Sequence, residues 1–138
     1  MTTTLRMQTE STPLTVCLAS APMTREEFYA FCQANRDLRI ERTAEGEVIV
    51  MPPAFSDTGN HNFNVSVPLG LWAEPDGTGL GFDSSTGFTL PNGAMRSPDA
   101  AWIRADRWRA LTPAEQASFA PLCPDVVIEL CSAREKIW

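Results

Sequence analysis

Two short apolar runs, each bounded by an acidic residue, constrain the fold of this 138-residue chain more than any other feature. Residues 100–103 are Ala-Ala-Trp-Ile and follow Asp99, and residues 126–130 are Val-Val-Ile-Glu-Leu, with Glu129 near the end. Runs of this length and composition predict buried β-strands. A carboxylate in such a strand is costly to desolvate unless a cation or several hydrogen bonds compensate it. If the two strands lie side by side, their acids form a small pocket of oxygen ligands suited to a divalent metal.

Helix and strand signals alternate in the first half of the chain. A capping box opens a helix over residues 24–35, where apolar residues recur at helical spacing. Two alternating runs around a glycine predict a β-hairpin over residues 38–51, with Glu41 on its polar face. A second helix is expected from about residue 57 to 72, kinked or interrupted at Pro68 because an internal proline costs about 3 kcal/mol.

The second half of the chain is expected to be mostly β-structure. Strands are predicted at residues 79–82 and 87–90, and Pro-Asn-Gly at 91–93 predicts a turn before the strand that carries Asp99. A second capping box opens a short helix over residues 112–119, ahead of the last strand. The sequence therefore predicts an α/β (α+β) fold.

Composition limits the organisation to one domain. A chain with 43% hydrophobic residues fills a single core. Residues 1–22, rich in Thr, Ser, Pro and Ala, are expected to be a poorly ordered leader before a domain at 23–138. Four scattered cysteines without a Cys-x-x-Cys pair indicate buried thiols in a reducing compartment, and no apolar run is long enough to span a bilayer. A cytoplasmic protein without a membrane segment is expected.

The charge pattern leaves a nucleic-acid partner open. A formal net charge of -6 argues against a surface that binds DNA by charge alone. The arginines nevertheless fall in two clusters, which could form a local basic rim or could be ordinary solvated faces: Arg36, Arg39 and Arg42, then Arg96, Arg104, Arg107 and Arg109. The one histidine, His61, lies on an apolar stripe of the second helix, so we assign it no chemistry.

Five segments, in this order and spacing, resemble the Uma-type restriction endonuclease family of the PD-(D/E)XK nuclease superfamily. The segments are residues 35–41, 46–53, 81–93, 97–103 and 124–130, and the resemblance covers most of residues 23–132. It implies a restriction-endonuclease-like fold, in which helices flank a mixed central sheet. It also implies metal-dependent hydrolysis of DNA phosphodiester bonds.

The resemblance assigns roles to individual acids. It implies that Asp99 and Glu129 bind Mg²⁺ or Mn²⁺, and that Glu41, which matches a recurrent acid of the family, is a weaker third candidate. Mg²⁺ prefers one or two protein carboxylates together with waters and substrate phosphate oxygens, so two acids suffice. From the residues alone, Asp99 could instead be a turn residue with a local Asx hydrogen bond, and Glu129 could face water at a sheet edge.

The chain departs from the family pattern after Glu129. An E-x-K motif would place lysine at position 131, where this chain has Cys131. A capping box beginning at Ser132 predicts a further helix that carries Lys136, the only lysine, which by resemblance would orient the attacking water. Because the relatives continue beyond this point, we expect the domain to lack their last helix and strands.

Two consequences of that expectation stay open. Aromatic residues left uncovered by the missing strands could support a homodimer, and Trp72, Trp102 and Trp108 fit core or dimer packing. The alternative to an endonuclease is a degenerate or truncated nuclease-fold module that acts in binding or protein interaction without catalysis.

Overall fold

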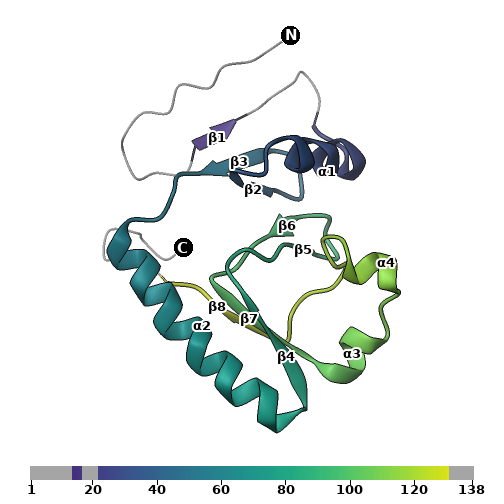
Figure 1. Ribbon diagram of the computed structural model, residues 1–138. Helices are drawn as coiled ribbons and strands as arrows, with labels where there is room; N and C mark the ends of the chain where they lie inside the picture. Colours follow the sequence, from purple (N-terminus) through teal and green to yellow (C-terminus); the bar gives the residue numbers. More distant parts are fainter. Residues whose placement is uncertain (1–13, 17–21, 131–138) are drawn as a thin grey trace.

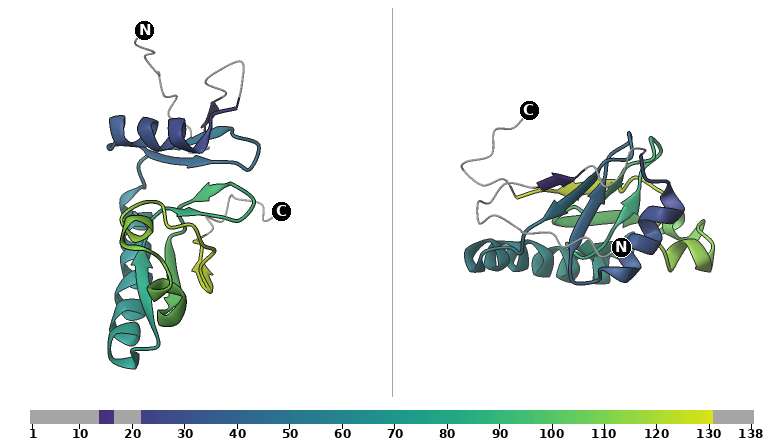
Figure 2. Two further views of the ribbon diagram at one scale, coloured as in Figure 1. Left: turned by 90° about the vertical axis from the view of Figure 1, so that its right-hand side faces the viewer. Right: turned by 90° about the horizontal axis from the view of Figure 1, so that it is seen from above.

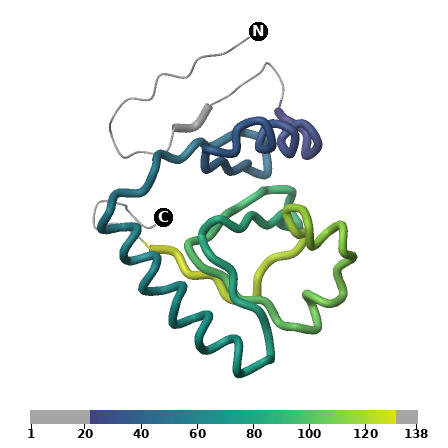
Figure 3. Tube along the Cα trace, viewed as in Figure 1, coloured from purple at the N-terminus to yellow at the C-terminus, as the bar shows by residue number. Residues whose placement is uncertain are grey.

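The computed structural model describes residues 14–16 and 22–130 (Figure 1), and Figure 3 traces the chain. The helices are α1 (Arg25–Ala34), α2 (Ser56–Asp76), α3 (Ala105–Arg109) and α4 (Pro113–Gln116). A five-stranded sheet has the order β1 (Leu14–Val16), β3 (Val48–Met51), β2 (Arg39–Arg42), β6 (Met95–Arg96) and β5 (Phe88–Thr89). A three-stranded sheet has the order β4 (Gly79–Asp83), β7 (Ala100–Arg104) and β8 (Val126–Ile128). The fold is therefore α+β, as the sequence predicts.

The arrangement of the strands differs from the single mixed sheet that the resemblance implies. All strand pairs within the two sheets are antiparallel in the described residues. The chain leaves the five-stranded sheet at Arg96 and enters the three-stranded sheet at Ala100. We call residues 97–99 the inter-sheet link. Pro98 within this link has no N–H to donate to a neighbouring strand, which favours a break in strand pairing here.

The first helix and the hairpin form as predicted and share one core. The side chain of Thr24 accepts a hydrogen bond from the Glu27 amide at 3.2 Å, and the Glu27 carboxylate accepts one from the Thr24 amide at 2.8 Å. The hairpin pairs β2 with β3 in the register Arg39↔Met51. The buried core between α1 and this sheet consists of Phe28, Ile40, Val48, Val50 and Met95.

Helix α2 crosses Pro68 as one helix of 21 residues, so the predicted end near Trp72 is too early. It lies along β4 (Figures 1 and 2), where Leu69 and Ala73 pack against Gly81. Tertiary packing of this kind offsets the local cost of an internal proline. The helix ends at Gly77, whose φ of 67° is the left-handed conformation that glycine adopts readily.

The three-stranded sheet has its own core on the face opposite α2. Phe88, Ala101, Ile103, Ala120 and Leu122 are buried there. The capping box at Thr112 forms as predicted, but α4 is only four residues long, and the sequence did not indicate α3. No helix in the described part of the chain is long and apolar enough to cross a membrane. The helix expected from Ser132, and most of the expected leader, lie outside the described residues.

Candidate active site

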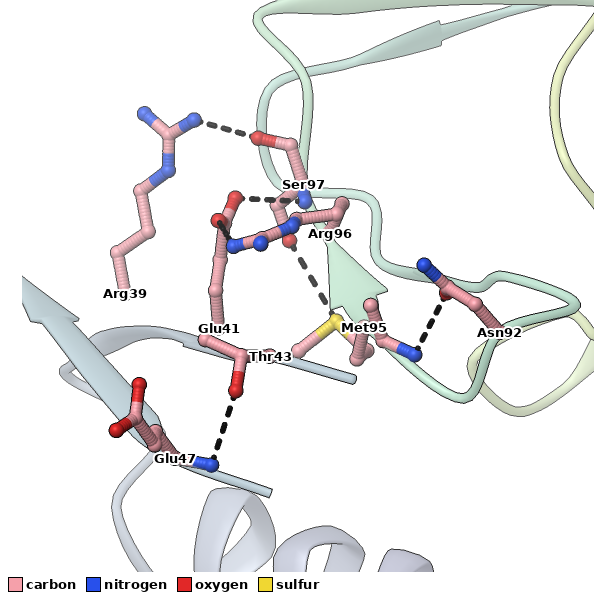
Figure 4. Close-up of polar contacts among 9 residues, drawn as sticks. Arg39, Glu41, Thr43, Glu47, Asn92, Met95, Arg96 and Ser97 are labelled. Atoms are coloured by element: carbon pink, nitrogen blue, oxygen red, sulfur yellow. Dashed lines mark hydrogen bonds and ion pairs between the residues drawn. The ribbon is translucent and has the colours of Figure 1, made fainter. Parts of the chain in front are cut away.

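Glu41 joins the first sheet to the inter-sheet link (Figure 4). Its side chain is buried, with 6% of the residue exposed. Oε1 accepts a hydrogen bond from the Ser97 amide at 2.9 Å, and Oε2 accepts one from Arg96 Nη1 at 3.0 Å. Glu41 lies on the polar side of β2, as predicted, since Ile40 is in the core, but this side is not solvated: Glu41 has an amide and a guanidinium in place of water.

Asp99 is also buried, with 8% of the residue exposed. Its Oδ2 accepts a hydrogen bond from the Leu130 amide at 2.7 Å, and its Oδ1 lies 3.6 Å from Arg39 Nη2. The bond to Leu130 joins residues 31 positions apart, so it is a tertiary contact and not a local Asx turn. It fixes the Asp99 carboxylate at the point where β8 ends.

Glu129 lies beside Asp99. The last residue pair of β7 and β8 at this end is Ala100 with Ile128, and Asp99 and Glu129 are the residues that adjoin it in the chain. The Asp99 carboxylate acts electrostatically on Glu129, which is consistent with this placement. The Glu129 side chain is exposed, and it is the least enclosed of the three acids.

The electrostatic environment of Glu129 shows that all three acids are neighbours. Partial burial raises the pKa of its carboxyl, and the carboxylates of Asp99 and Glu41 raise this pKa further. The Arg39 guanidinium and the Asp99 amide act in the opposite direction. Repulsion among the carboxylates therefore exceeds the compensation from nearby donors, and the group favours a bound proton or cation.

A metal site built from three side chains is not present in the described residues: no group of three His, Cys, Asp or Glu there is arranged to hold an ion. The bonding of Glu41 gives a reason, since both of its oxygens already accept hydrogen bonds. Asp99 and Glu129 are then the two oxygen ligands that the arrangement offers. Cys131 and Lys136 lie outside the described residues.

Two of the clustered arginines make contacts within the protein. Arg42 donates to the carbonyl oxygens of Met23 and Gly93, and Arg107 pairs with Asp125 at 2.8 Å. These guanidinium groups hold loops of the protein itself. Arg39 is different, because Nη2 donates to the Ser97 carbonyl at 2.6 Å beside Asp99.

Sequence reasoning grouped Arg39 with other arginines without placing it beside Asp99, and it missed Ser97. A signal for Arg39 was available: residues 39 and 41 are two apart in a strand, so they share a face, and any segment that covers Glu41 also meets Arg39. Ser97 contributes its backbone amide and carbonyl, which no side-chain pattern reveals.

A pocket of the described surface lies away from the candidate acids. It has a volume of about 360 Å³ between α2 and β4 and contains none of the candidate acids. His61 on α2 is exposed. Among the described cysteines, Cys32 and Cys123 are free thiols, and burial raises the pKa of Cys32 to about 11.

The sequence was compared with known proteins and protein families. No curated protein matches the sequence. The family model described as "Uma2: Putative restriction endonuclease" matches residues 25–136, a span that includes Glu41, Asp99 and Glu129. Because this match covers far more than half of the 138 residues, the chain belongs to the Uma2 restriction endonuclease family.

Proposed function

We propose that this protein is a metal-dependent endonuclease that hydrolyses DNA phosphodiester bonds, with Asp99 and Glu129 as the ligands of Mg²⁺ or Mn²⁺. Family membership supports the reaction class and the DNA substrate. The observation that carries the proposal is that Asp99 and Glu129 adjoin the last residue pair of β7 and β8 and that their carboxylates interact electrostatically.

The donor set fits a divalent cation. Partial burial raises the pKa of Glu129 most, and repulsion from the adjacent Asp99 carboxylate raises this pKa further. A hard cation relieves the repulsion, and magnesium sites commonly use only one or two protein carboxylates. Bound Mg²⁺ would supply Lewis acidity and lower the pKa of a coordinated water.

Residues of the protein would orient the metal ligands and accept a proton. The Leu130 amide holds the Asp99 carboxylate in place, which keeps one ligand oriented. Glu129 is exposed and its pKa is raised by partial burial and by nearby carboxylates, so its carboxylate oxygen is suited to accept a proton from an attacking water. Glu41 supports the site through the Ser97 amide, and Lys136 stays a prediction for orienting that water.

Nicking of supercoiled plasmid DNA tests the proposal. The wild-type chain should nick plasmid with Mg²⁺ or Mn²⁺ and lose this activity in EDTA. Asp99→Asn and Glu129→Gln keep the size of each side chain and should reduce nicking to background. Glu47→Gln removes one negative charge from an exposed position of the hairpin and is the matched control. Equal nicking by all four proteins would refute the proposal.

One observation favours a second candidate, a nuclease-fold module without catalysis. Both oxygens of Asp99 already have protein partners, one in the Leu130 amide and one near Arg39. In this second candidate, these protein contacts to the Asp99 carboxylate take the place of a bound metal. Calorimetry with Mg²⁺ separates the two candidates: absence of binding at neutral pH, together with absence of nicking, leaves the module.

The predicted homodimer also stays a prediction. Helix α2 has apolar surface for it, since Phe63, Leu71 and Trp72 are each more than half exposed, although Trp72 also packs against Trp102. Light scattering tests it, and a monomer at working concentration would remove this part of the proposal.

A further inference from the structure

Arg39 is the cation that the structure sets beside the acid pair. Its side chain extends from β2 to the inter-sheet link (Figure 4), where Nη2 donates to the Ser97 carbonyl at 2.6 Å. The same nitrogen lies 3.6 Å from Asp99 Oδ1. Arg39 also acts electrostatically on Glu129, which means that it is near both proposed metal ligands.

The contact between Arg39 and Asp99 is not a closed ion pair. Charge-assisted hydrogen bonds between a guanidinium and a carboxylate are typically about 2.7–2.9 Å and often bidentate. Here the distance is 3.6 Å, and 33% of the Arg39 side chain is exposed. Its Nε is buried without an acceptor among the described residues. The guanidinium therefore has donor capacity that the described protein contacts do not use.

Neighbouring arginines contrast with this arrangement. Arg96 bonds Glu41 at 3.0 Å, Arg42 holds two loop carbonyls, and Arg104 pairs with Asp106 beyond the far end of β7. Each of these guanidinium groups is engaged away from the Asp99 carboxylate. Arg39 alone among these four combines proximity to Asp99 with partial exposure.

We propose that Arg39 binds a non-bridging oxygen of the DNA phosphate that enters the site between Asp99 and Glu129. The inference rests on the proposed function, since it uses the same acid pair. A guanidinium presents a planar set of donors that matches phosphate oxygens. It also supplies positive charge to a chain that has Cys131 in place of lysine in the E-x-K motif. Arg39 then contributes to DNA affinity even when no metal is present.

Binding without cleavage tests this role independently of catalysis. Fluorescence anisotropy of a short labelled DNA duplex is measured with the full chain in EDTA. Arg39→Gln should weaken binding by about five- to tenfold at about 50 mM salt and reduce the salt-dependence slope by about 1. Arg36→Gln removes the same charge from an exposed residue three positions away, and it should change affinity less than about twofold. Equal effects of the two variants would overturn the proposal.

A second measurement uses the wild-type chain and does not depend on how a variant folds. An arginine-specific dicarbonyl reagent is applied with and without saturating duplex, and modification at each arginine is followed by mass spectrometry. DNA should slow modification of Arg39 by at least about fivefold and leave Arg36 nearly unchanged. An unchanged rate at Arg39, or no DNA binding by the wild-type chain, would overturn the proposal.

Failure of the proposed function gives a different pattern. If the wild-type chain does not nick plasmid but Arg39 is protected by DNA, the phosphate contact stands and catalysis fails. If nicking depends on Asp99 and Glu129 while Arg39 is neither protected nor required for affinity, the endonuclease stands and the role of Arg39 fails.

Discussion

Replacement of Glu41 by alanine should destabilise the fold, because this carboxylate connects β2 to the inter-sheet link. The bond from the Ser97 amide is buried on both sides, with Glu41 6% and Ser97 8% exposed. A hydrogen bond to a charged group contributes about 1.5–3 kcal/mol, and its loss leaves the buried Ser97 amide unpaired. The Arg96 side chain is 40% exposed, so its pairing with Glu41 adds only about 0.5 kcal/mol.

These contributions give an expected loss of about 2–3 kcal/mol in the free energy of unfolding for Glu41→Ala. Glu41→Gln keeps an oxygen that can accept from Ser97, and it should cost about 1 kcal/mol because the acceptor is neutral. Urea unfolding followed by circular dichroism measures both values. Glu47→Ala, an exposed acid on the same hairpin, should stay within about 0.5 kcal/mol of wild type.

The comparison of these variants can refute the reasoning directly. A loss for Glu41→Ala no larger than that for Glu47→Ala would mean that the Ser97 amide finds another acceptor or reaches water. A loss for Glu41→Gln equal to that for Glu41→Ala would mean that the charge, and not the bond to Ser97, is the main contribution. Either result would return Glu41 to the list of candidate metal ligands.

Three further outcomes follow from the structure. Thr24→Ala removes the N-cap of α1 and should cost about 1 kcal/mol in urea unfolding; an unchanged midpoint would contradict this. Gly79→Ala would place a methyl group against the Trp102 ring and should lower the free energy of unfolding by about 1–3 kcal/mol. Gly59→Ala lies in open space on α2 and should raise the free energy of unfolding by about 0.5–1 kcal/mol. The raised pKa of Glu129 means that its ionised form destabilises the fold, so Glu129→Gln should raise the Tm at neutral pH. This gain should shrink as the pH falls towards the ordinary value of 4.5, and a gain that grows on acidification would have the wrong sign.

Elements with local signals were predictable from the sequence. The capping boxes at Thr24 and Thr112 form because a side chain and an amide three residues apart satisfy each other without help from the rest of the fold. The turn at Asn92 and Gly93 is local in the same sense, since Asn92 accepts a hydrogen bond from the Ala94 amide and Gly93 has a φ of 89°. Such features depend on neighbouring residues only.

Elements that depend on tertiary contacts were predicted less well. Pro68 suggested an interruption because the local cost of proline is known, but the packing of α2 on β4 is not visible in the sequence. Alternation in β2 indicated the polar side on which Glu41 lies, but it did not indicate that this residue is buried. Its burial depends on Arg96 and Ser97, which are 55 and 56 residues away in the sequence.

The strands beside Asp99 and Glu129 were predictable in part from the sequence. Apolar runs beside Asp99 and Glu129 predicted two buried strands, and β7 and β8 do pair, with Ala100 opposite Ile128. Only β7 is buried, because Val126 and Val127 of β8 are each nearly half exposed, so the predicted burial of β8 is wrong. Which sheet each strand joins was not predictable, because strand pairing depends on contacts distant in sequence. The change of sheet at Pro98 has a consequence for the site. Pairing in β6 ends at Arg96 and pairing in β7 begins at Ala100, so Asp99 lies outside both strands, and Arg39 and the Leu130 amide are the partners of its carboxylate. Partners of that kind can exchange with a cation or a phosphate, whereas paired backbone in the middle of a sheet cannot.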